Sequence, residues 1–452
     1  MFSEKLPYRL LNLRPFPARP LTHTTCLHGL RGLAAVAVFV RHLLISFWEY
    51  PDHGCASASS PELAGNNKIC HHLPIPLRIL FAGNAMVSVF FVVSGYLDSI
   101  KPLQFIHAHQ FEALQAHTAS SVLRRGPRLF LPALAASTLI SVAVWLGLYE
   151  WGLAYRLTFF DSLPPHLLSR HANPFTQLAA MLASFRKLFD LFNFKPINPK
   201  VNMHYWTLPY DLRGTLVRHL AIMSTSRLTP MARMAAILIL ILFCGSYARW
   251  ELALNLCGLL LCQIDILFQA RARTTKDGEK QSWRWVNTML IVASLYLCTY
   301  PKENGAQTPG YRLLGKLAPT PSSSGWQDYR WWNSWAAVML VWGVLHQDSA
   351  SKFLEGGVPQ YLGSISFAVY LLHGPVLHIT AYEIIPMTWT ISDGSVFGDV
   401  LGFLLPTLLV VVPCVLLAAD LFARTIEVKC YGLIQRAERA LLDDRGKESC
   451  LS

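Results

Sequence analysis

The sequence predicts an all-α integral membrane protein with about ten transmembrane helices in one bundle. Three observations support this prediction. Of 452 residues, 53% are hydrophobic and only 15% are charged, and the apolar residues form blocks of membrane-crossing length. Soluble domains contain roughly 25% charged residues. The composition therefore excludes an ordinary soluble enzyme, although the length alone would suggest two or three soluble domains.

Ten apolar blocks are expected to cross the membrane. They are residues 28–48, 79–97, 128–149, 207–226, 232–248, 251–270, 285–300, 332–347, 361–385 and 398–421. The fourth block is the weakest, because Arg213, Arg218 and His219 interrupt it, and the fifth and sixth can also form a tight helical hairpin. Two long loops, 150–206 and 301–331, separate the blocks, and the second is expected to lack regular structure.

The charge pattern predicts the topology. Lys and Arg gather between spans and at the termini, as the positive-inside rule requires of cytosolic segments, so we attribute the net charge of +12 to membrane flanks and expect no nucleic-acid partner. We divide the chain into a cytosolic tail (1–25), a membrane domain (26–430) and a second cytosolic tail (431–452). An endomembrane such as the endoplasmic reticulum is the expected location.

The ten cysteines have irregular spacing and form no CxxC pair, so no metal site is expected. Several lie inside apolar blocks, where a cysteine is most simply a small buried hydrophobe. Cys55 and Cys70 share a loop predicted to face the lumen. A disulfide between them and two unpaired thiols remain equal alternatives.

A pair of ionisable residues stands inside the first apolar block. The run from Cys26 to His42 reads CLHGLRGLAAVAVFVRH and places Arg31 and His42 eleven residues apart. In an α-helix the two side chains are then only about 20° apart around the axis and about 16 Å apart along it. Arg31 alone is typical of a snorkelling side chain, and His42 alone of a hydrogen-bonded one. Two aligned ionisable groups in hydrocarbon favour a functional pair.

A second polar motif, FFVVSGY, occupies residues 90–96. Ser94 and Gly95 are small and permit close helix approach, so helix packing is the first interpretation. Contact of Ser94 and Tyr96 with substrate is the second interpretation. The run lacks the G-x-S-x-G pattern of a nucleophile elbow, which argues against a serine hydrolase.

A basic motif lies at the start of the third block. Arg124, Arg125 and Arg128 flank Gly126-Pro127, where a helix is expected to begin. Helix N-termini attract anions, and guanidinium groups bind phosphates through paired N–H donors. The arginines therefore predict either a phosphate site or a positive-inside signal, and their spacing does not decide between the two.

Two further motifs carry polar side chains next to or inside apolar blocks. YWTLPYDLRG contains Trp206, Asp211 and Arg213. Here the carboxylate is expected to pair with Arg213 or with an internal partner. SFAVYLLH ends at His373, for which a buried, hydrogen-bonded imidazole and a catalytic role are both considered.

Taken in order, GLRGLAA…H, FFVVSGY, RR-x-x-R-L-x-x-P, YWTLPYDLRG and LGSISFAVYLLHGP make this chain resemble the acyltransferase 3 family, especially its fungal members, from about residue 26 to residue 430. The resemblance implies ten or so helices, acyl-CoA as donor and O-acylation of sugars or lipophilic small molecules. Arg31 and His42 fall on the family's pair of Arg and His separated by ten residues, and Arg125 and Arg128 on its basic motif. Asp211 takes a place that Glu usually fills.

The resemblance predicts a membrane O-acyltransferase that transfers groups other than aminoacyl groups. It moves an acyl group, expected to be acetyl, from acyl-CoA to a hydroxyl of a lipophilic small molecule such as a fungal secondary metabolite. A carbohydrate acceptor and a transporter or flippase for a hydrophobic metabolite are the alternatives.

The partners are the lipid bilayer, the acyl-CoA donor and the small-molecule hydroxyl acceptor, with acyl-CoA as co-substrate and no bound cofactor. The predicted residues are catalytic Arg31, His42 and His373, donor-binding Arg31, Arg125 and Arg128, and substrate-binding Ser94, Tyr96, Trp206 and Asp211.

Overall fold

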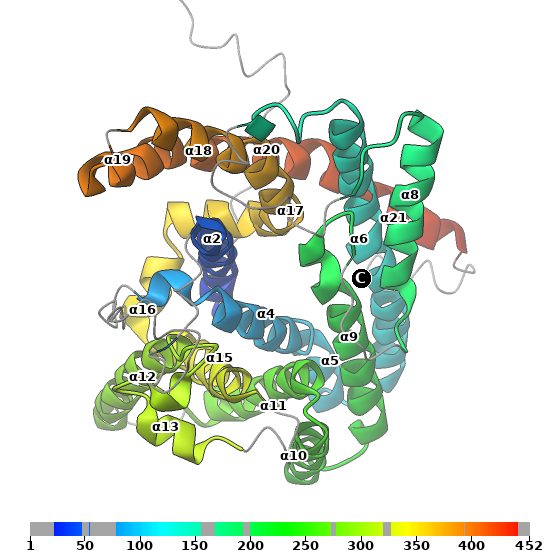
Figure 1. The fold of residues 1–452 in the computed structure, drawn as a ribbon. Coiled ribbons are helices and arrows are strands. Elements are labelled where there is room, and N and C mark those ends of the chain that lie inside the picture. The colour runs from blue at the N-terminus through cyan, green and yellow to red at the C-terminus, as the bar shows by residue number, and fades with distance from the viewer. Residues whose placement is uncertain are drawn as a thin grey trace, which may run out of the picture.

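The computed structural model is all-helical over the residues it describes, which confirms the predicted class (Figure 1). The described residues are 22–47, 54, 78–154, 168–192, 199–272, 277–319, 327–392 and 394–441. The helices are α2 (Thr25–Phe47), α4 (Gly83–Leu97), α5 (Ile100–His107), α6 (Phe111–Trp145), α8 (Pro174–Arg186), α9 (Thr207–Thr225), α10 (Pro230–Ser246), α11 (Trp250–Ala272), α12 (Asp277–Cys298), α13 (Arg312–Leu317), α15 (Asp328–His346), α16 (Asp348–Leu354), α17 (Gly357–Ile379), α18 (Ala381–Ile391), α19 (Val396–Pro406), α20 (Val412–Phe422) and α21 (Val428–Leu441).

Six helical stretches of the described chain are long and apolar enough to cross a membrane. They are Thr25–Phe47, Gly83–His107, Phe111–Trp145, Trp250–Gln269, Gly357–Ile391 and Val396–Leu441. Pro230–Ser246 and Arg284–Cys298 are shorter apolar helices. Each of the ten predicted blocks overlaps a helix, so the protein is a multi-pass membrane protein, and the exact number of spans stays a prediction.

Helix α2 lies deep in the bundle, where α17 and α4 pack against it (Figure 1). Two glycines of the first sequence motif allow this packing. A Cβ at Gly29 would lie 2.0 Å from the carbonyl oxygen of Leu354, and a Cβ at Gly32 would lie 2.4 Å from the backbone nitrogen of Gly363. The GLRG run therefore brings α2 against α16 and α17, and this contact fixes the helix that carries Arg31 and His42.

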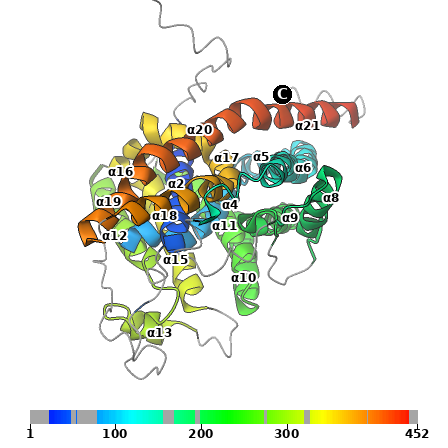
Figure 2. The same ribbon diagram turned by 45° about the horizontal axis from the view of Figure 1, so that its top comes forward.

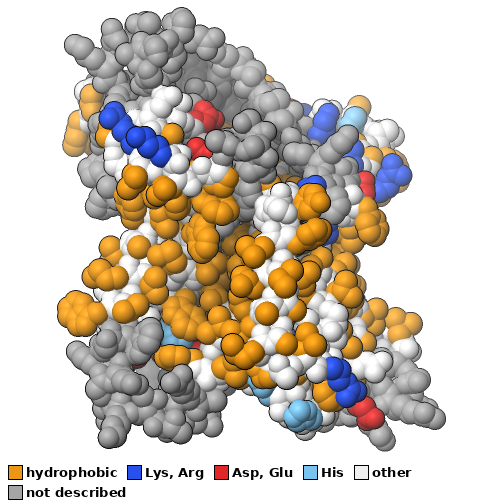
Figure 3. All heavy atoms as spheres, turned by 90° about the horizontal axis from the view of Figure 1, so that it is seen from below, with side chains coloured by type: hydrophobic (Ala, Val, Ile, Leu, Met, Phe, Trp, Pro, Cys, Tyr) orange, Lys and Arg blue, Asp and Glu red, His pale blue; other side chains and the backbone are white. Residues whose placement is uncertain are grey.

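The outer surface is that of a membrane protein. Figure 3 shows hydrophobic side chains gathered in a band across the middle of one face, with charged side chains above and below it. Large apolar side chains on α10 are widely exposed, including Ile239 at 65% and Leu242 at 64%. Exposed apolar area on this scale matches a lipid-facing surface, since soluble monomers rarely show it.

The two long loops contain helical segments. The expectation that residues 301–331 lack regular structure is wrong, because Gly305–Gln307 forms a 3₁₀ turn and α13 follows it. Loop 150–206 contains α8, whose first turn is capped by the Asn173 side chain accepting from Phe175 N–H at 2.8 Å. The predicted C-terminal tail begins inside α21, which runs along the upper edge of the molecule in Figure 2.

The cysteine predictions divide between described and undescribed residues. Cys244, Cys262 and Cys298 are buried among apolar side chains, as expected. Cys257 and Cys414 are partly exposed, and both are free thiols. Cys55 and Cys70, with the disulfide question they raise, lie outside the described residues.

Candidate active site

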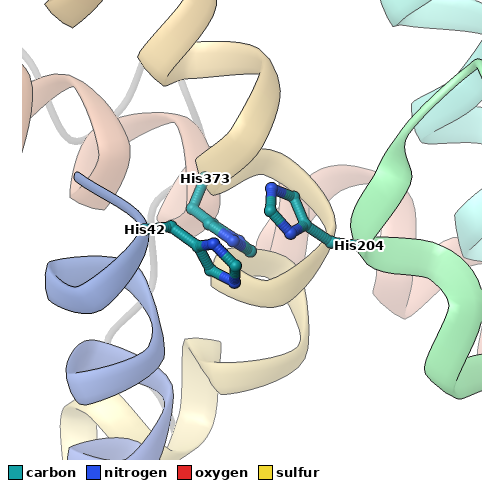
Figure 4. Close-up of side chains that lie close together, drawn as sticks. All are labelled: His42, His204 and His373. Atoms are coloured by element: carbon teal, nitrogen blue, oxygen red, sulfur yellow. The ribbon is translucent and has the colours of Figure 1, made fainter. Parts of the chain in front are cut away.

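Three histidines from three separate elements meet inside the bundle (Figure 4). His42 comes from α2, His373 from α17, and His204 from the 3₁₀ turn Met203–Trp206. The ring centroids are 4.1 Å apart for His42 and His204, 4.3 Å for His204 and His373, and 5.4 Å for His42 and His373. One nitrogen of each ring lies within 4.8 Å of the others. We refer to these three residues as the imidazole cluster.

The tautomer of His373 follows from its hydrogen bond. Its Nδ1 lies 2.9 Å from the carbonyl oxygen of Val369. A carbonyl can only accept, so Nδ1 carries the proton and a neutral ring keeps its lone pair on Nε2. The residue is 1% exposed, and Nε2 has no hydrogen-bond partner among the described residues. A buried acceptor without a partner is costly unless a ligand group satisfies it.

Hydrogen bonds to α17 fix the turn that holds His204. The Asn202 side chain accepts from the backbone N–H of His204 at 3.0 Å, and the Tyr370 hydroxyl donates to the carbonyl of His204 at 2.9 Å. Thr207 in turn donates its hydroxyl to Tyr370 at 2.9 Å. The backbone on both sides of the imidazole is therefore bonded into the bundle.

A proline in α17 supplies a further acceptor for the same turn. Pro375 has no N–H, so the carbonyl of Leu371, one helical turn earlier, lacks its usual donor. The Asn202 amide donates to this oxygen at 3.0 Å and the Tyr205 hydroxyl at 3.3 Å. Next to the proline, Gly374 provides space for the ring, since a Cβ there would lie 2.6 Å from Cδ2 of His204. The HGP sequence therefore brings His204 against α17.

The imidazole rings influence one another electrostatically. Burial, together with the neighbouring rings of His42 and His373, lowers the pKa of His204 well below its ordinary value. The turn that carries His204 lies outside the six candidate spans. Charging several rings at these separations would place like charges side by side in a buried site. His204 is therefore neutral near neutral pH, so it places no positive charge beside the other two rings.

A second polar cluster is formed by Asp98, Arg125, Asp211 and Arg218, and we name it the arginine–aspartate cluster. Arg125 donates Nη2 to both carboxylate oxygens of Asp211, at 2.9 and 3.0 Å, and its Nη1 lies 3.2 Å from Asp98. Arg125 also donates to the Ser94 hydroxyl at 2.8 Å. Arg218 is fully buried and bonds Asp98 at 2.9 Å. Two guanidinium groups therefore balance two carboxylates within α4, α6 and α9.

Arg31 and Arg128 lie beside this balanced cluster and add positive charge to it, and the carboxyl of Glu427 lies within electrostatic range of Arg31. Arg31 is within electrostatic range of Arg125 and Asp98, but it makes no hydrogen bond or ion pair within the described part of the chain. Arg128 lies over the ring of Tyr431, 5.9 Å from its centroid. Both guanidinium groups keep their donors available for an anion.

The structure separates the four residues predicted to bind substrate. Ser94 and Asp211 belong to the arginine–aspartate cluster, and the internal partner of Asp211 is Arg125. Arg213 instead lies over the ring of Tyr210, with its guanidinium carbon 4.4 Å from the ring centroid. Tyr96 donates its hydroxyl to Asp265 on α11.

Trp206 is two residues along the chain from His204. Its ring centroid lies 5.3 Å from that of Tyr210 and 6.3 Å from that of Trp250. Of the four, only Trp206 belongs to the turn that carries His204.

His204, Asp98 and the pairing role of Arg218 were not predicted from the sequence. His204 immediately precedes the YWTLP motif. Its position at the edge of a polar motif, next to an apolar block, is the feature of the sequence that could have marked it as a site residue. Nothing in the spacing links it to His42 or His373. Asp98 follows FFVVSGY by two residues and ends α4, where only the folded bundle brings it to Arg125.

Comparisons with known proteins agree with this architecture. The family described as "Acyltransferase domain" (Acyl_transf_3) matches residues 25–419. An O-acetyltransferase, PaAT-1, from Phomopsis amygdali is 27% identical over 81% of this chain and 75% of its own length. An acyltransferase, clz18, from Cochliobolus lunatus is 24% identical over 94% of this chain and 98% of its own. An acyltransferase, R4, from a Phoma species is 23% identical over the same shares. No solved structure matches the chain.

The family match spans both the imidazole cluster and the arginine–aspartate cluster, and the fungal relatives align over most of the chain. The protein is therefore a membrane enzyme that transfers acyl groups, and it belongs to the acyltransferase 3 family.

Proposed function

We propose that the protein transfers an acetyl group from acetyl-CoA to a hydroxyl of a lipophilic small molecule at the imidazole cluster. The observation that carries this proposal is the convergence of His42, His204 and His373, with the lone pair of His373 Nε2 buried and unpartnered within the described residues. Family membership and the name of the Phomopsis relative support acyl transfer and the choice of acetyl.

In the proposed reaction His42 is the general base. One of its ring nitrogens takes the proton of the acceptor hydroxyl while that oxygen attacks the thioester carbonyl. The tetrahedral intermediate collapses, the carbon–sulfur bond breaks, and the thiolate of coenzyme A takes up a proton as the ester leaves. His204 faces the same space as a neutral donor that stabilises the developing oxyanion. His373, with Nε2 free to accept, is the reserve base.

We assign the donor phosphates to Arg31 and Arg128. The sequence motif predicts the same role for Arg125, but the guanidinium donors of Arg125 are shared among Asp98, Asp211 and Ser94. Exchanging those bonds for phosphate would leave the partly buried carboxylate of Asp211 without its charged partner. We therefore propose that Arg125 holds the frame on which Arg31 is placed, and that unpaired arginines bind the anion through charge-assisted hydrogen bonds.

For the acceptor, the proposal rests on the fungal relatives and on the aromatic neighbours of the turn. Trp206, with Tyr210 and Trp250 beside it, offers apolar surface close to His204 along the chain. Ser94, Tyr96 and Asp211 already have protein partners, so we assign them to the framework. We further propose cytosolic termini and an endomembrane location, where acyl-CoA reaches the side of the bundle that carries Arg31.

The test is acyl transfer by the purified full-length protein in detergent. Acetyl-CoA is supplied with and without extracted lipophilic metabolites, and free thiol and product masses are measured. We expect thiol release that depends on the acceptor, together with products heavier by the mass of one acetyl group replacing hydrogen. Protein that leaves acetyl-CoA intact with every acceptor class, yet moves a metabolite across vesicle membranes, would establish the transporter alternative instead.

A further inference from the structure

A third polar cluster lies apart from the proposed reaction centre and joins the start of α2 to two other helices. It consists of His23, Asp265 on α11 and His346 at the end of α15, and we name it the Asp265 cluster. His23 Nε2 lies 3.2 Å from Asp265 Oδ2, and His346 Nε2 lies 2.9 Å from Asp265 Oδ1. The two imidazole nitrogens and the carboxylate all lie within 4.8 Å of one another.

The contact of His346 with Asp265 requires a positive charge that a neutral imidazole lacks. Its Nδ1 lies 2.9 Å from the carbonyl oxygen of Trp342, so Nδ1 carries a proton. Its Nε2 faces the carboxylate of Asp265. A neutral imidazole has one N–H, so this contact would set two lone pairs against each other. Either a second proton or a metal ion must stand between the nitrogen and the carboxylate.

The surroundings of the three side chains match those of a metal site. Metal-bound histidines usually donate their other N–H to a carbonyl, as His346 does to Trp342, whose ring also stacks on it at 4.0 Å. Metal-bound carboxylates are in turn hydrogen-bonded, and Asp265 accepts from the Tyr96 hydroxyl and from the Gln269 amide at 2.8 Å. The His346 ring and the carboxylate are therefore fixed from outside the cluster.

Exposure within the cluster runs from the interior to the surface. The Asp265 side chain is 1% exposed, that of His346 is 10% and that of His23 is 40%. This order gives an ion an entry path past His23. Zinc bound at about 2.0–2.1 Å in a tetrahedron separates its ligand atoms by about 3.3 Å. Each imidazole nitrogen lies about that far from one oxygen of Asp265, His23 Nε2 from Oδ2 at 3.2 Å and His346 Nε2 from Oδ1 at 2.9 Å.

We propose that the Asp265 cluster binds one divalent transition-metal ion, with zinc as the expected occupant. Two imidazoles and one carboxylate are a donor set that zinc prefers over calcium or magnesium. The ion would clamp the segment before α2 onto α11 and α15, and so hold in place the helix that carries Arg31 and His42. The site lies outside the catalytic assignments made above and does not depend on them.

The test measures metal and not activity. Full-length protein in detergent is purified without chelator, equilibrated with buffered zinc, and its metal content is measured by mass spectrometry. We expect about one zinc per chain, and zinc binding at least tenfold weaker in His23→Gln and Asp265→Asn. His23→Gln is the fold-sparing variant because its side chain is partly exposed. A zinc chelator should lower the melting temperature of the wild type and leave that of Asp265→Asn unchanged.

Two controls make the result specific. His109 is exposed and outside every cluster, and His109→Asn suits its positive φ of 57°, so this variant should keep the zinc. His373→Gln should keep it as well. Wild-type protein that binds no zinc would show that His346 is simply doubly protonated, which overturns the proposal. Zinc lost from His373→Gln but kept by Asp265→Asn would overturn it too, because the ion would then lie in the imidazole cluster.

Discussion

The imidazole cluster and the arginine–aspartate cluster are both polar groups held among the helices, yet they use their side chains in opposite ways. In the arginine–aspartate cluster, Arg125 bonds two carboxylates and a hydroxyl, and Arg218 shares one of those carboxylates. In the imidazole cluster, the backbone around His204 is fully bonded, but within the described residues the single ring hydrogen bond is made by His373 Nδ1.

This difference separates framework from chemistry. Paired charges lower the cost of their own burial and hold helices together, but they have no capacity left for a substrate. Rings that are held firmly while their nitrogens stay free are arranged to exchange protons. The contrast predicts that changes in the first cluster reduce stability, whereas changes in the second reduce the rate.

The largest effect should come from His42→Ala. Loss of a general base typically costs 10²–10⁴-fold in kcat, about 3–5 kcal/mol of barrier. Thiol release from acetyl-CoA measures the rate, and melting in detergent checks the fold, with His109→Asn as an exposed-histidine control. Near-normal transfer by well-folded His42→Ala protein would remove His42 from the mechanism.

Gly374→Ala should reduce kcat by roughly 10–100-fold without touching any catalytic side chain, because a displacement of about 1 Å can cost that much. The added Cβ would come within 2.6 Å of the His204 ring and force it away from α17. Gly357→Ala is the matched control, since the same helix leaves open space at that position. Equal rates for the two variants would show that the position of His204 is unimportant.

Asp211→Asn should act mainly on stability. It removes a charged partner of Arg125 in a mostly buried site, which we expect to cost about 1–3 kcal/mol of unfolding free energy. The measurement is a melting curve, alongside the KM for acetyl-CoA, which should stay near the wild-type value. Asp348→Asn is the control, because its pair with Arg284 is exposed and should matter much less. A variant that melts normally but loses donor binding would place Asp211 at the substrate.

Arg31→Lys should raise the KM for the donor roughly tenfold, because lysine keeps the charge but loses the paired donors that grip a phosphate. Its melting temperature should hardly change, since Arg31 has no ion pair among the described residues. Steady-state kinetics with varied acetyl-CoA give the value, and Arg436→Lys on the exposed face of α21 is the control. An unchanged KM would make Arg31 an anchor at the membrane interface.

The smallest expected effect is that of mild acid. Burial and the rings of His42 and His373 lower the pKa of His204, so its neutral form persists to lower pH than that of a free histidine, whose pKa is about 6.5. The kcat/KM for transfer should therefore stay constant from pH 8 to below 6.5 and fall only under more acidic conditions. A half-maximal value at or above pH 6.5 would mean that a solvated histidine controls the rate.

Helices could be predicted from sequence because each apolar block carries its own signal, and every predicted block overlaps a helix. The alignment of Arg31 and His42 could also be predicted, because residues eleven apart lie on nearly the same side of an α-helix. Long-range pairing could not be read this way. The Asn202 amide donates a hydrogen bond to the carbonyl oxygen of Leu371, 169 residues away in sequence. That oxygen can accept it because Pro375 has no N–H to occupy it within the helix.

The role of Arg125 illustrates the same limit. Its spacing in the motif is compatible with phosphate binding or with a topology signal, and neither interpretation includes Asp98 and Asp211 as partners. Those carboxylates reach it from α4 and α9 only when the helices pack. A sequence motif therefore indicates that a charged residue has either a functional or a structural role. The partners of that residue in the folded protein determine which of the two roles it has.

The central claim is that His42 and His204 serve one reaction centre, and a double-mutant cycle tests it most directly. Rates of thiol release are measured for His42→Ala, His204→Ala and the double variant, with melting curves to confirm that each is folded. Residues that act as a unit give strongly non-additive losses, so the double variant should be about as slow as the slower single variant. Losses that multiply, as for independent sites, would contradict the account.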